Sequence, residues 1–253
     1  MNLSVLLYRE YKLKTKAISF YMFQIIQPTF YLLFMGILFG TTFNIEIKYG
    51  GMQLDYLSYL LPGIMAMQAV NAMYSNSANI FNEYRYGVYR SLVLSRVSPF
   101  SYIVSKIIIE SMLSTIYASS LMIGYHLIYA KPIGEMSVGF LLSVPIIMLS
   151  AVFWSLLGAL MGFLFGNEEK RTMIFTLLNM PLVFISTVFY PPETAWIRSL
   201  VMLNPLTYSA NLIREAMLKR SILLSDLAIF LLLVIIAFLA IRILIKRLPL
   251  IKK

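Results

Sequence analysis

One polar and basic stretch between two long apolar runs decides how this chain is organised: Asn82-Glu83-Tyr84-Arg85-Tyr86-Gly87-Val88-Tyr89-Arg90-Ser91-Leu92-Val93-Leu94-Ser95-Arg96, continuing to Lys106. Aromatic and aliphatic residues recur in it at spacings of three and four, and the arginines lie largely off that stripe, which predicts a short amphipathic helix. The stripe consists of Tyr86, Tyr89, Val93 and Val97. Such a helix can lie on a membrane surface or in the groove of a partner protein. A basic loop that contacts anionic lipid is the simpler alternative.

Composition indicates an integral membrane protein. Of the 253 residues, 60% are hydrophobic and 13% are charged, with a mean hydropathy of +0.80, whereas soluble domains carry about a quarter charged residues. The absence of cysteine and the single histidine, His126, exclude a disulfide framework and a histidine-rich metal or haem site. No glycine-rich phosphate loop and no paired catalytic residues are present. We therefore expect no enzyme activity and no cofactor bound by this chain itself.

Six apolar runs are each long enough to cross a bilayer, for which roughly 20 residues suffice. They cover residues 18–43, 56–81, 107–129, 136–165, 172–190 and 226–245. The predicted fold is an all-α integral membrane protein with one transmembrane domain over residues 1–253, and with an interfacial helix at its start. Lysine and arginine gather in the terminal segments and in the loops at 82–106 and 166–171, which predicts a multi-pass cell-membrane protein with both termini in the cytoplasm. The net charge of +10 then needs no nucleic acid to explain it.

Residues 191–221 are too polar to cross a membrane and too apolar for a free loop. Apolar residues at helical spacing on both sides of Asn204-Pro205 predict two short helices that break at this dipeptide. The pair can lie on the outer leaflet as surface helices, or form a re-entrant lid over a transport path. For the lid, the candidate outer-gate residues are Trp196, Asn204, Pro205, Tyr208 and Arg214.

Glycines four residues apart predict closely packed helices. Gly36 and Gly40 form such a pair in the first span, and Gly158 and Gly162 form one in the fourth. Small residues at this spacing let helix backbones approach each other closely. Packing inside one subunit and contact between two subunits both fit the pattern.

Glu110 is the acidic residue placed inside a predicted span, where ionisable residues are often functional. Because Lys106 precedes it by one helical turn, we expect a salt bridge between the two at the cytoplasmic edge. A secondary transporter would need ion-coupling acids near the midplane. An intramembrane enzyme would need a nucleophile and a base. Only Glu110, near the edge, is available for the first, and no such pair is visible for the second, so neither alternative is favoured.

Four stretches make the chain similar to the permeases of ABC-2 type transporters. They are Gln27-Pro28 with Leu32–Gly36 in the first span, Leu60–Ile64 in the second, Arg85–Ser95 in the cytoplasmic segment, and Phe189-Tyr190-Pro191 followed by Trp196, Leu203–Tyr208 and Arg214. The order and spacing of the last set are the most characteristic. The chain departs from the family at Arg90, where an acid is common, and at Arg96, where a proline is common.

This resemblance implies the membrane subunit of an ATP-driven exporter. Two permease subunits, in a homodimer or a paralogous heterodimer, would work with separate ABC ATPase subunits that bind ATP and Mg²⁺. The helix in the 82–106 stretch would be the coupling helix that docks on the ATPase, and its candidate coupling residues are Glu83, Arg85, Tyr86, Gly87, Tyr89 and Arg90. A Leu-Gly-x-x-Trp pattern typical of polysaccharide exporters is missing at Ile18–Phe23. Its absence favours an amphiphilic or drug-like substrate, with a polysaccharide or glycolipid as the alternative.

Overall fold

The computed structural model describes residues 3–16, 18–43, 45–129, 133–192, 194–219 and 221–247. The side chain of His126 and the basic tail beyond Arg247 lie outside this description. The elements are α1 (Leu3–Lys16), α2 (Ile18–Met35), a π-helical turn (Gly36–Thr42), β1 (Glu46–Tyr49), β2 (Met52–Asp55), α3 (Tyr56–Arg85), α4 (Val88–Leu94), α5 (Pro99–Tyr129), α6 (Ile133–Leu164), α7 (Glu168–Phe184), α8 (Ala195–Met202), α9 (Pro205–Leu218) and α10 (Leu224–Arg247).

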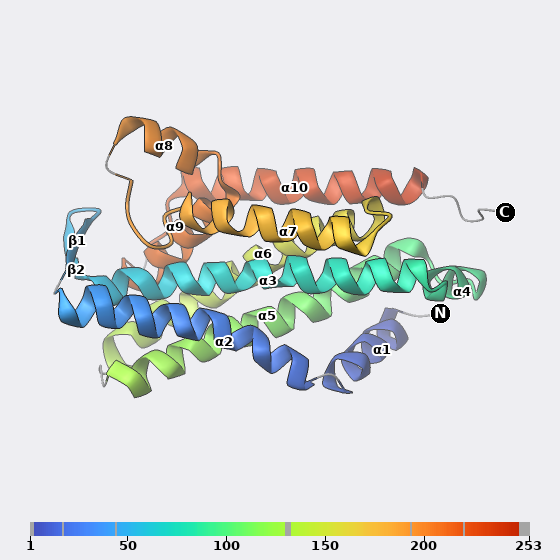
Figure 1. Cartoon of the computed structure of the whole chain (residues 1–253), viewed down its shortest axis with the longest axis horizontal. Coiled ribbons are helices and arrows are strands. Elements are labelled where there is room, and N and C mark those ends of the chain that lie inside the picture. Colours follow the sequence, from blue (N-terminus) through green and yellow to red (C-terminus); the bar gives the residue numbers. More distant parts are fainter. Residues whose placement is uncertain are drawn as a thin grey trace.

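The long helices form an elongated bundle (Figure 1). α2, α3, α5, α6, α7 and α10 run roughly along its long axis. α1, α4 and the C-terminal end of α10 lie at one end, and the β1–β2 hairpin and α8 lie at the other. The two ends of the described chain therefore share one end of the bundle, as an even number of crossings would require.

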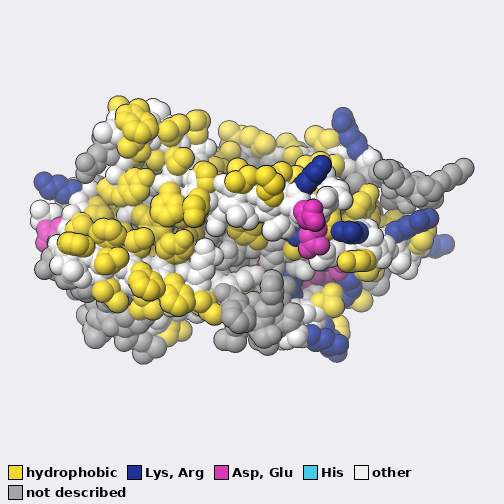
Figure 2. All heavy atoms as spheres, in the orientation of Figure 1, with side chains coloured by type: hydrophobic (Ala, Val, Ile, Leu, Met, Phe, Trp, Pro, Cys, Tyr) yellow, Lys and Arg dark blue, Asp and Glu magenta, His cyan; other side chains and the backbone are white. Residues whose placement is uncertain are grey.

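Three helices are long and apolar enough to span a membrane within the part of the chain that the structure describes: Pro99–Tyr125 of α5, Val138–Leu164 of α6 and Leu224–Arg247 of α10. Gln24–Gly40 is a shorter apolar helical stretch. Figure 2 shows hydrophobic side chains over the middle of the visible face and most charged ones near the end that carries α4. Length and composition therefore support a membrane protein, while the predicted count of six spans stays a prediction.

α3 occupies the centre of the bundle, because most of its 30 residues are buried against α5, α6 and α9. Two glycines of α6 allow the closest contact. A Cβ atom added at Gly158 would lie 2.4 Å from the carbonyl oxygen of Met73, and one at Gly162 would lie 2.9 Å from that of Ser77. A Cβ at Gly40 would meet the Leu57 side chain at 3.0 Å, and Gly36 is also buried. At Gly40, Gly158 and Gly162 the close neighbours thus belong to the same chain.

The helical pair after α7 breaks where the sequence predicts. Asn204 precedes α9 and its side-chain oxygen accepts a hydrogen bond from the amide of Leu206 at 2.9 Å, while Pro205 occupies the first turn. α9 is not a surface helix, however, because Thr207 and Arg214 on its polar side are as buried as its apolar residues. Only α8 has the exposed character that the surface-pair interpretation requires, with Trp196 at 68% exposure.

The expectation of an all-α chain is wrong for residues 46–55, which form the antiparallel hairpin β1–β2 in the register Glu46 to Asp55. Gly50 and Gly51 make its turn with φ angles of 55° and 83°. Two consecutive residues with positive φ are the requirement of a tight hairpin turn, and adjacent glycines meet it without strain. The Gly-Gly pair is the sequence signal for this hairpin.

Candidate functional site

The predicted helix over residues 84–97 is interrupted at Gly87. α3 ends at Arg85, and Gly87 has the left-handed φ of 78°, where a side chain would be strained. α4 then begins in a new direction, so Tyr86 and Tyr89 do not share a face. Tyr86 is 74% exposed and Tyr89 is 4% exposed. The predicted stripe is therefore wrong at Tyr86, because it assumed one continuous helix, whereas Tyr89, Val93 and Val97 do pack against the bundle.

Tyr89 anchors α4 to the bundle. Its ring lies 5.2 Å from that of Tyr102 on α5, 5.4 Å from that of Phe163 on α6 and 5.8 Å from that of Tyr84 on α3, measured between centroids. Val97, just before α5, is buried as well. These contacts turn the opposite side of the segment outward. The exposed side chains are Arg85, Tyr86, Val88, Arg90, Ser91, Leu94, Ser95 and Arg96.

A buried group of charged residues supports this end of the bundle. Lys106 on α5 donates from its Nζ atom to Glu10 at 3.1 Å, and it lies 3.2 Å from Glu83 of α3. Arg9 of α1 donates to Glu83 at 2.8 Å and to Glu10 at 2.5 Å. Tyr102 donates its hydroxyl to Glu83 at 2.7 Å. Glu83, at the end of α3, is thus tied to both α1 and α5 a few residues before the exposed α4 segment.

A second pair extends this group toward the bundle centre. Lys14 of α1 donates to Glu110 of α5, and also to the hydroxyl of Ser75 on α3 at 3.2 Å. The expected salt bridge between Lys106 and Glu110 is wrong. α1 packs against α5 and supplies Glu10 to Lys106 and Lys14 to Glu110. Glu10 and Lys14 are buried, so most of this charged face of α1 does not lie on a lipid surface.

We call the six charged residues Arg9, Glu10, Lys14, Glu83, Lys106 and Glu110 the charge cluster. Its cations and carboxylates balance, which is a condition for burying charge without a large cost. Burial by itself raises the pKa of Glu83, but the charge on Lys106 and the hydrogen bonds from Tyr102 and Arg9 outweigh it. The pKa of the Glu83 carboxyl therefore lies below its ordinary value.

Sequence reasoning missed the members of the charge cluster on α1. Glu10 and Lys14 stand four residues apart, as do Lys106 and Glu110, and the two pairs have opposite order of charge. That complementarity was a signal for pairing of the two helices. Nothing local in the sequence shows that α1 packs against α5, and its predicted place at the membrane interface stays a prediction.

At the opposite end, Arg214 acts as a buried clamp between elements. It is fully buried and donates to the carbonyl oxygens of Tyr59 at 3.1 Å and Thr187 at 2.8 Å, and to the Asn211 side chain at 3.2 Å. Its guanidinium carbon also lies 3.8 Å from the centroid of the Tyr59 ring. Arg214 thus joins α9, α3 and the segment that follows α7.

Two further outer-gate candidates hold the same region together. Asn204 donates to the carbonyl oxygens of Leu182 at 2.7 Å and Ile185 at 2.5 Å, which the end of α7 leaves without helical partners. Tyr208 donates to the carbonyl oxygen of Met202 at 2.7 Å. The exposed Trp196 takes part in none of these hydrogen bonds. Asn204, Tyr208 and Arg214 therefore have structural partners.

Apolar helices able to span a bilayer, packed around polar clusters near the two ends, define a helical membrane protein. The particular family follows from sequence comparison. The chain belongs to the ABC-2 type transporter family, whose profile matches residues 1–218.

Two curated relatives support the assignment. The chain is 29% identical over 195 residues to a protein of Cyanophora paradoxa named as transport permease ycf38, and the match covers 75% of this chain and 65% of the relative. It is 24% identical over 201 residues to the daunorubicin resistance ABC transporter permease protein DrrB1 of Streptomyces coeruleorubidus, covering 76% of this chain and 66% of the relative. The matches thus span slightly under two thirds of each relative. No solved structure matches the chain. The family is one of transport permeases and not of enzymes, as the sequence predicted.

Proposed function

We propose that this chain is the membrane-spanning permease subunit of an ATP-binding-cassette exporter that moves an amphiphilic or drug-like substrate out of the cytoplasm or the inner leaflet. Separate ABC ATPase subunits supply the ATP hydrolysis, and two permease subunits form the transport path. Family membership supports this proposal, and the name of the Streptomyces relative favours a drug-like substrate over a polysaccharide or glycolipid. The proposed topology has six spans with both termini in the cytoplasm.

The observation that carries the proposal is the exposed α4 segment on its rigid support. Tyr86 and Leu94 are exposed at 74% and 66%, next to the exposed cations Arg85, Arg90 and Arg96. Aromatic and arginine side chains are the residues that contribute most to protein interfaces, while lysine is depleted there. A surface of this composition suits a docking site for an ATPase subunit better than a simple lipid contact.

The six candidate coupling residues take two different roles in this proposal. Arg85, Tyr86 and Arg90 are exposed and would contact the ATPase. Glu83, Gly87 and Tyr89 support that surface: Glu83 through the charge cluster, Gly87 through its backbone turn, and Tyr89 through its ring contacts. A displacement of α4 would reach α1, α3 and α5 through these contacts, which is how a packed interface converts a local push into a helix shift.

The test replaces the exposed anchors without touching the core. Tyr86→Ala combined with Leu94→Ala should leave the permease inserted and folded but weaken its association with the ATPase by more than about 2 kcal/mol, which is roughly thirtyfold. Co-purification of the two subunits and substrate-stimulated ATP hydrolysis are measured. Trp196→Ala, at a similarly exposed aromatic at the other end of the bundle, is the matched control for co-purification and should leave it unchanged. Full retention of both properties in the double variant would return the segment to a lipid-contacting loop.

A further inference from the structure

A pocket that is open to the surface lies between α3 and α7, and both apolar and polar side chains line it. It has a volume of about 550 Å³. Amide and hydroxyl side chains contribute much of its lining: Ser75, Asn79, Asn82, Thr172, Thr176 and Asn179. Tyr74 and Asn179 connect the two helices across it through a hydrogen bond of 2.9 Å.

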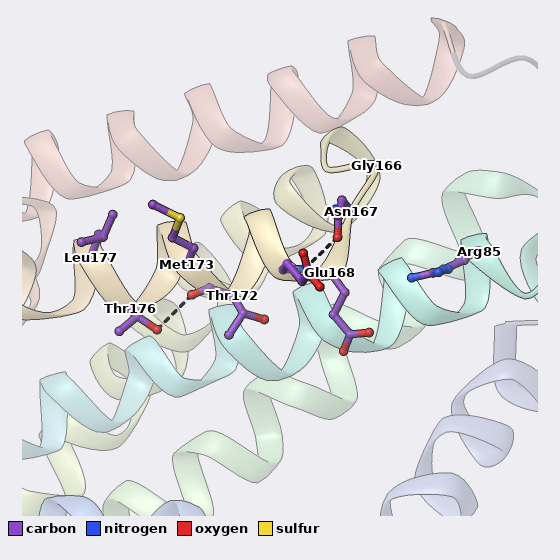
Figure 3. Close-up of a pocket in the computed structure, with 9 residues that line it drawn as sticks. Arg85, Gly166, Asn167, Glu168, Thr172, Met173, Thr176 and Leu177 are labelled. Atoms are coloured by element: carbon purple, nitrogen blue, oxygen red, sulfur yellow. Dashed lines mark hydrogen bonds between the residues drawn. The ribbon is translucent and has the colours of Figure 1, made fainter.

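A second open pocket, of about 890 Å³, lies nearer the end of the bundle that carries α4, and Figure 3 draws the residues that line it. Thr172 and Thr176 line both spaces, and in Figure 3 they lie on the side of α7 nearer α3, with Arg85 at the end of α3. The two pockets therefore adjoin along α7.

Among the described residues that line the pocket between α3 and α7, one is charged, namely Arg171. It is 6% exposed, and its guanidinium lies against the rings of Phe81 at 5.4 Å and Phe175 at 5.8 Å. Its nearest carboxylate belongs to Glu168, at 3.8 Å, which is beyond hydrogen-bond length. Within the described residues the Nε atom of Arg171 has no hydrogen-bond partner, and no other described group accepts from its guanidinium.

Arg214 shows what a satisfied buried arginine looks like in this protein, since it has three hydrogen-bond acceptors. Arg171 is buried to a similar extent but lacks such acceptors. A buried cation without acceptors is unfavourable, and a guanidinium is shaped to bind phosphate or carboxylate oxygens in pairs. The acceptor that Arg171 lacks is therefore best supplied by a ligand in this pocket.

We propose that the pocket between α3 and α7 binds an acidic amphiphile, with its phosphate or carboxylate on Arg171 and its apolar part along Phe175 and Met180. The neighbouring asparagine amides and the Thr172 hydroxyl donate further hydrogen bonds to the same head group, whereas the Thr176 hydroxyl already donates to the carbonyl oxygen of Thr172. Glu168 stands at the rim with a half-exposed side chain, and it stays hydrated when the ligand replaces it beside Arg171. This inference rests on the proposed export function and names its substrate class. An anionic membrane lipid and a soluble acidic amphiphile present the same head-group chemistry.

The test measures binding to the purified full-length permease in nanodiscs of phosphatidylcholine. Dodecyl phosphate and dodecyl trimethylammonium have the same tail and opposite charge. We expect binding of dodecyl phosphate and at least tenfold weaker binding of the cation. Arg171→Gln should weaken dodecyl phosphate binding at least about tenfold, as loss of a charged hydrogen-bond donor does. Lys170→Gln removes the same charge from the exposed neighbouring position and should change it less than about twofold.

A second measurement uses the unaltered chain, because Arg171→Gln removes a buried group and can affect folding. A photoreactive alkyl phosphate should label peptides of α3 and α7 that line the pocket, and dodecyl phosphate should compete while dodecyl trimethylammonium should not. Labelling only elsewhere, equal binding of the two head groups, or unchanged binding by a folded Arg171→Gln variant would overturn the proposal.

Phosphatidylglycerol added to the nanodiscs separates the two sources of the head group. Displacement of dodecyl phosphate by this lipid supports the site and assigns it to an anionic lipid. Binding that is indifferent to the lipid supports the site and assigns it to a soluble acidic amphiphile. If the wild-type permease binds the ATPase but not dodecyl phosphate, only the inferred substrate class is refuted. If the wild-type permease does not associate with an ATPase, the proposed function itself is refuted.

Discussion

Lys106→Ala tests whether the charge cluster holds the α4 end of the bundle together. Lys106 is 3% exposed and is the cation shared by Glu10 and Glu83, at 3.1 and 3.2 Å. Removing one partner of a buried ion pair costs about 3–5 kcal/mol, because the remaining charge stays buried without compensation. Arg9 still bonds both carboxylates after the change. We therefore expect Lys106→Ala to lower the free energy of unfolding by about 3 kcal/mol, the lower end of this range.

The assay is reversible denaturation of the purified chain in mixed micelles, followed by the loss of helical circular dichroism. Lys12→Ala is the matched control, because Lys12 lies on α1, which contributes to the cluster, but is exposed and should change stability by less than about 0.5 kcal/mol. Adding Glu83→Gln to Lys106→Ala should recover part of the loss, since it removes one of the uncompensated negative charges.

A loss below about 1 kcal/mol for Lys106→Ala would refute this reasoning, because that is the range of exposed ion pairs. It would mean that water reaches the cluster and that the tie between α1, α3 and α5 is weak. Failure of Glu83→Gln to improve the Lys106→Ala variant would point the same way, since the two residues would then not be coupled.

Three further outcomes are expected. Folding lowers the pKa of Glu83, so its contribution to stability is complete above its ordinary pKa of 4.5 and is lost as the pH falls toward the folded value. The free energy of unfolding of the Glu83→Gln variant, measured from pH 6 downward, should therefore change less with pH in this range than that of the wild type. Gly158→Leu should lower the free energy of unfolding by at least about 1–3 kcal/mol, because the side chain forces α6 away from α3. Gly166→Leu is the control and should be nearly neutral, because a Cβ there meets nothing within 4 Å. A similar loss of stability for both variants would contradict the packing. Cysteines at Lys48 and Arg90 should be labelled by impermeant reagents from the outside and from the inside, respectively, and the reverse pattern would invert the proposed topology.

Features set by local sequence could be predicted, and they include parts of the candidate site. Asn204-Pro205 breaks the helical pair because its capping side chain and its proline ring act on adjacent residues. Run length identified α5, α6 and α10 as helices long and apolar enough to cross a membrane, while the other three predicted spans stay predictions. The sequence also indicated an exposed basic segment around Arg90. Charged residues on a short helix are usually exposed, so this followed from composition.

Features set by distant contacts could not be predicted. Which face of α4 is buried depends on Phe163 of α6, far along the chain, and on a backbone turn at Gly87 that a helical periodicity search passes over. The choice of Glu10, in place of Glu110, as a partner of Lys106 depends on α1 packing against α5. Arg171 and Arg214 look alike in the sequence, and only the folded chain shows that one has acceptors and the other has none in the described residues.

The charge cluster also sets the order in which the chain can assemble. Arg9 and Glu83 are 74 residues apart in the sequence, and Glu10 and Lys106 are 96 residues apart, so α1 is synthesised well before its partners. Until α5 is made, Glu10 and Lys14 lack these partners, and burying the two residues without them would be costly. The helix at the start of the chain can thus reach its final place only after α5 has been made, and the α4 surface is complete only when Phe163 of α6 has joined it.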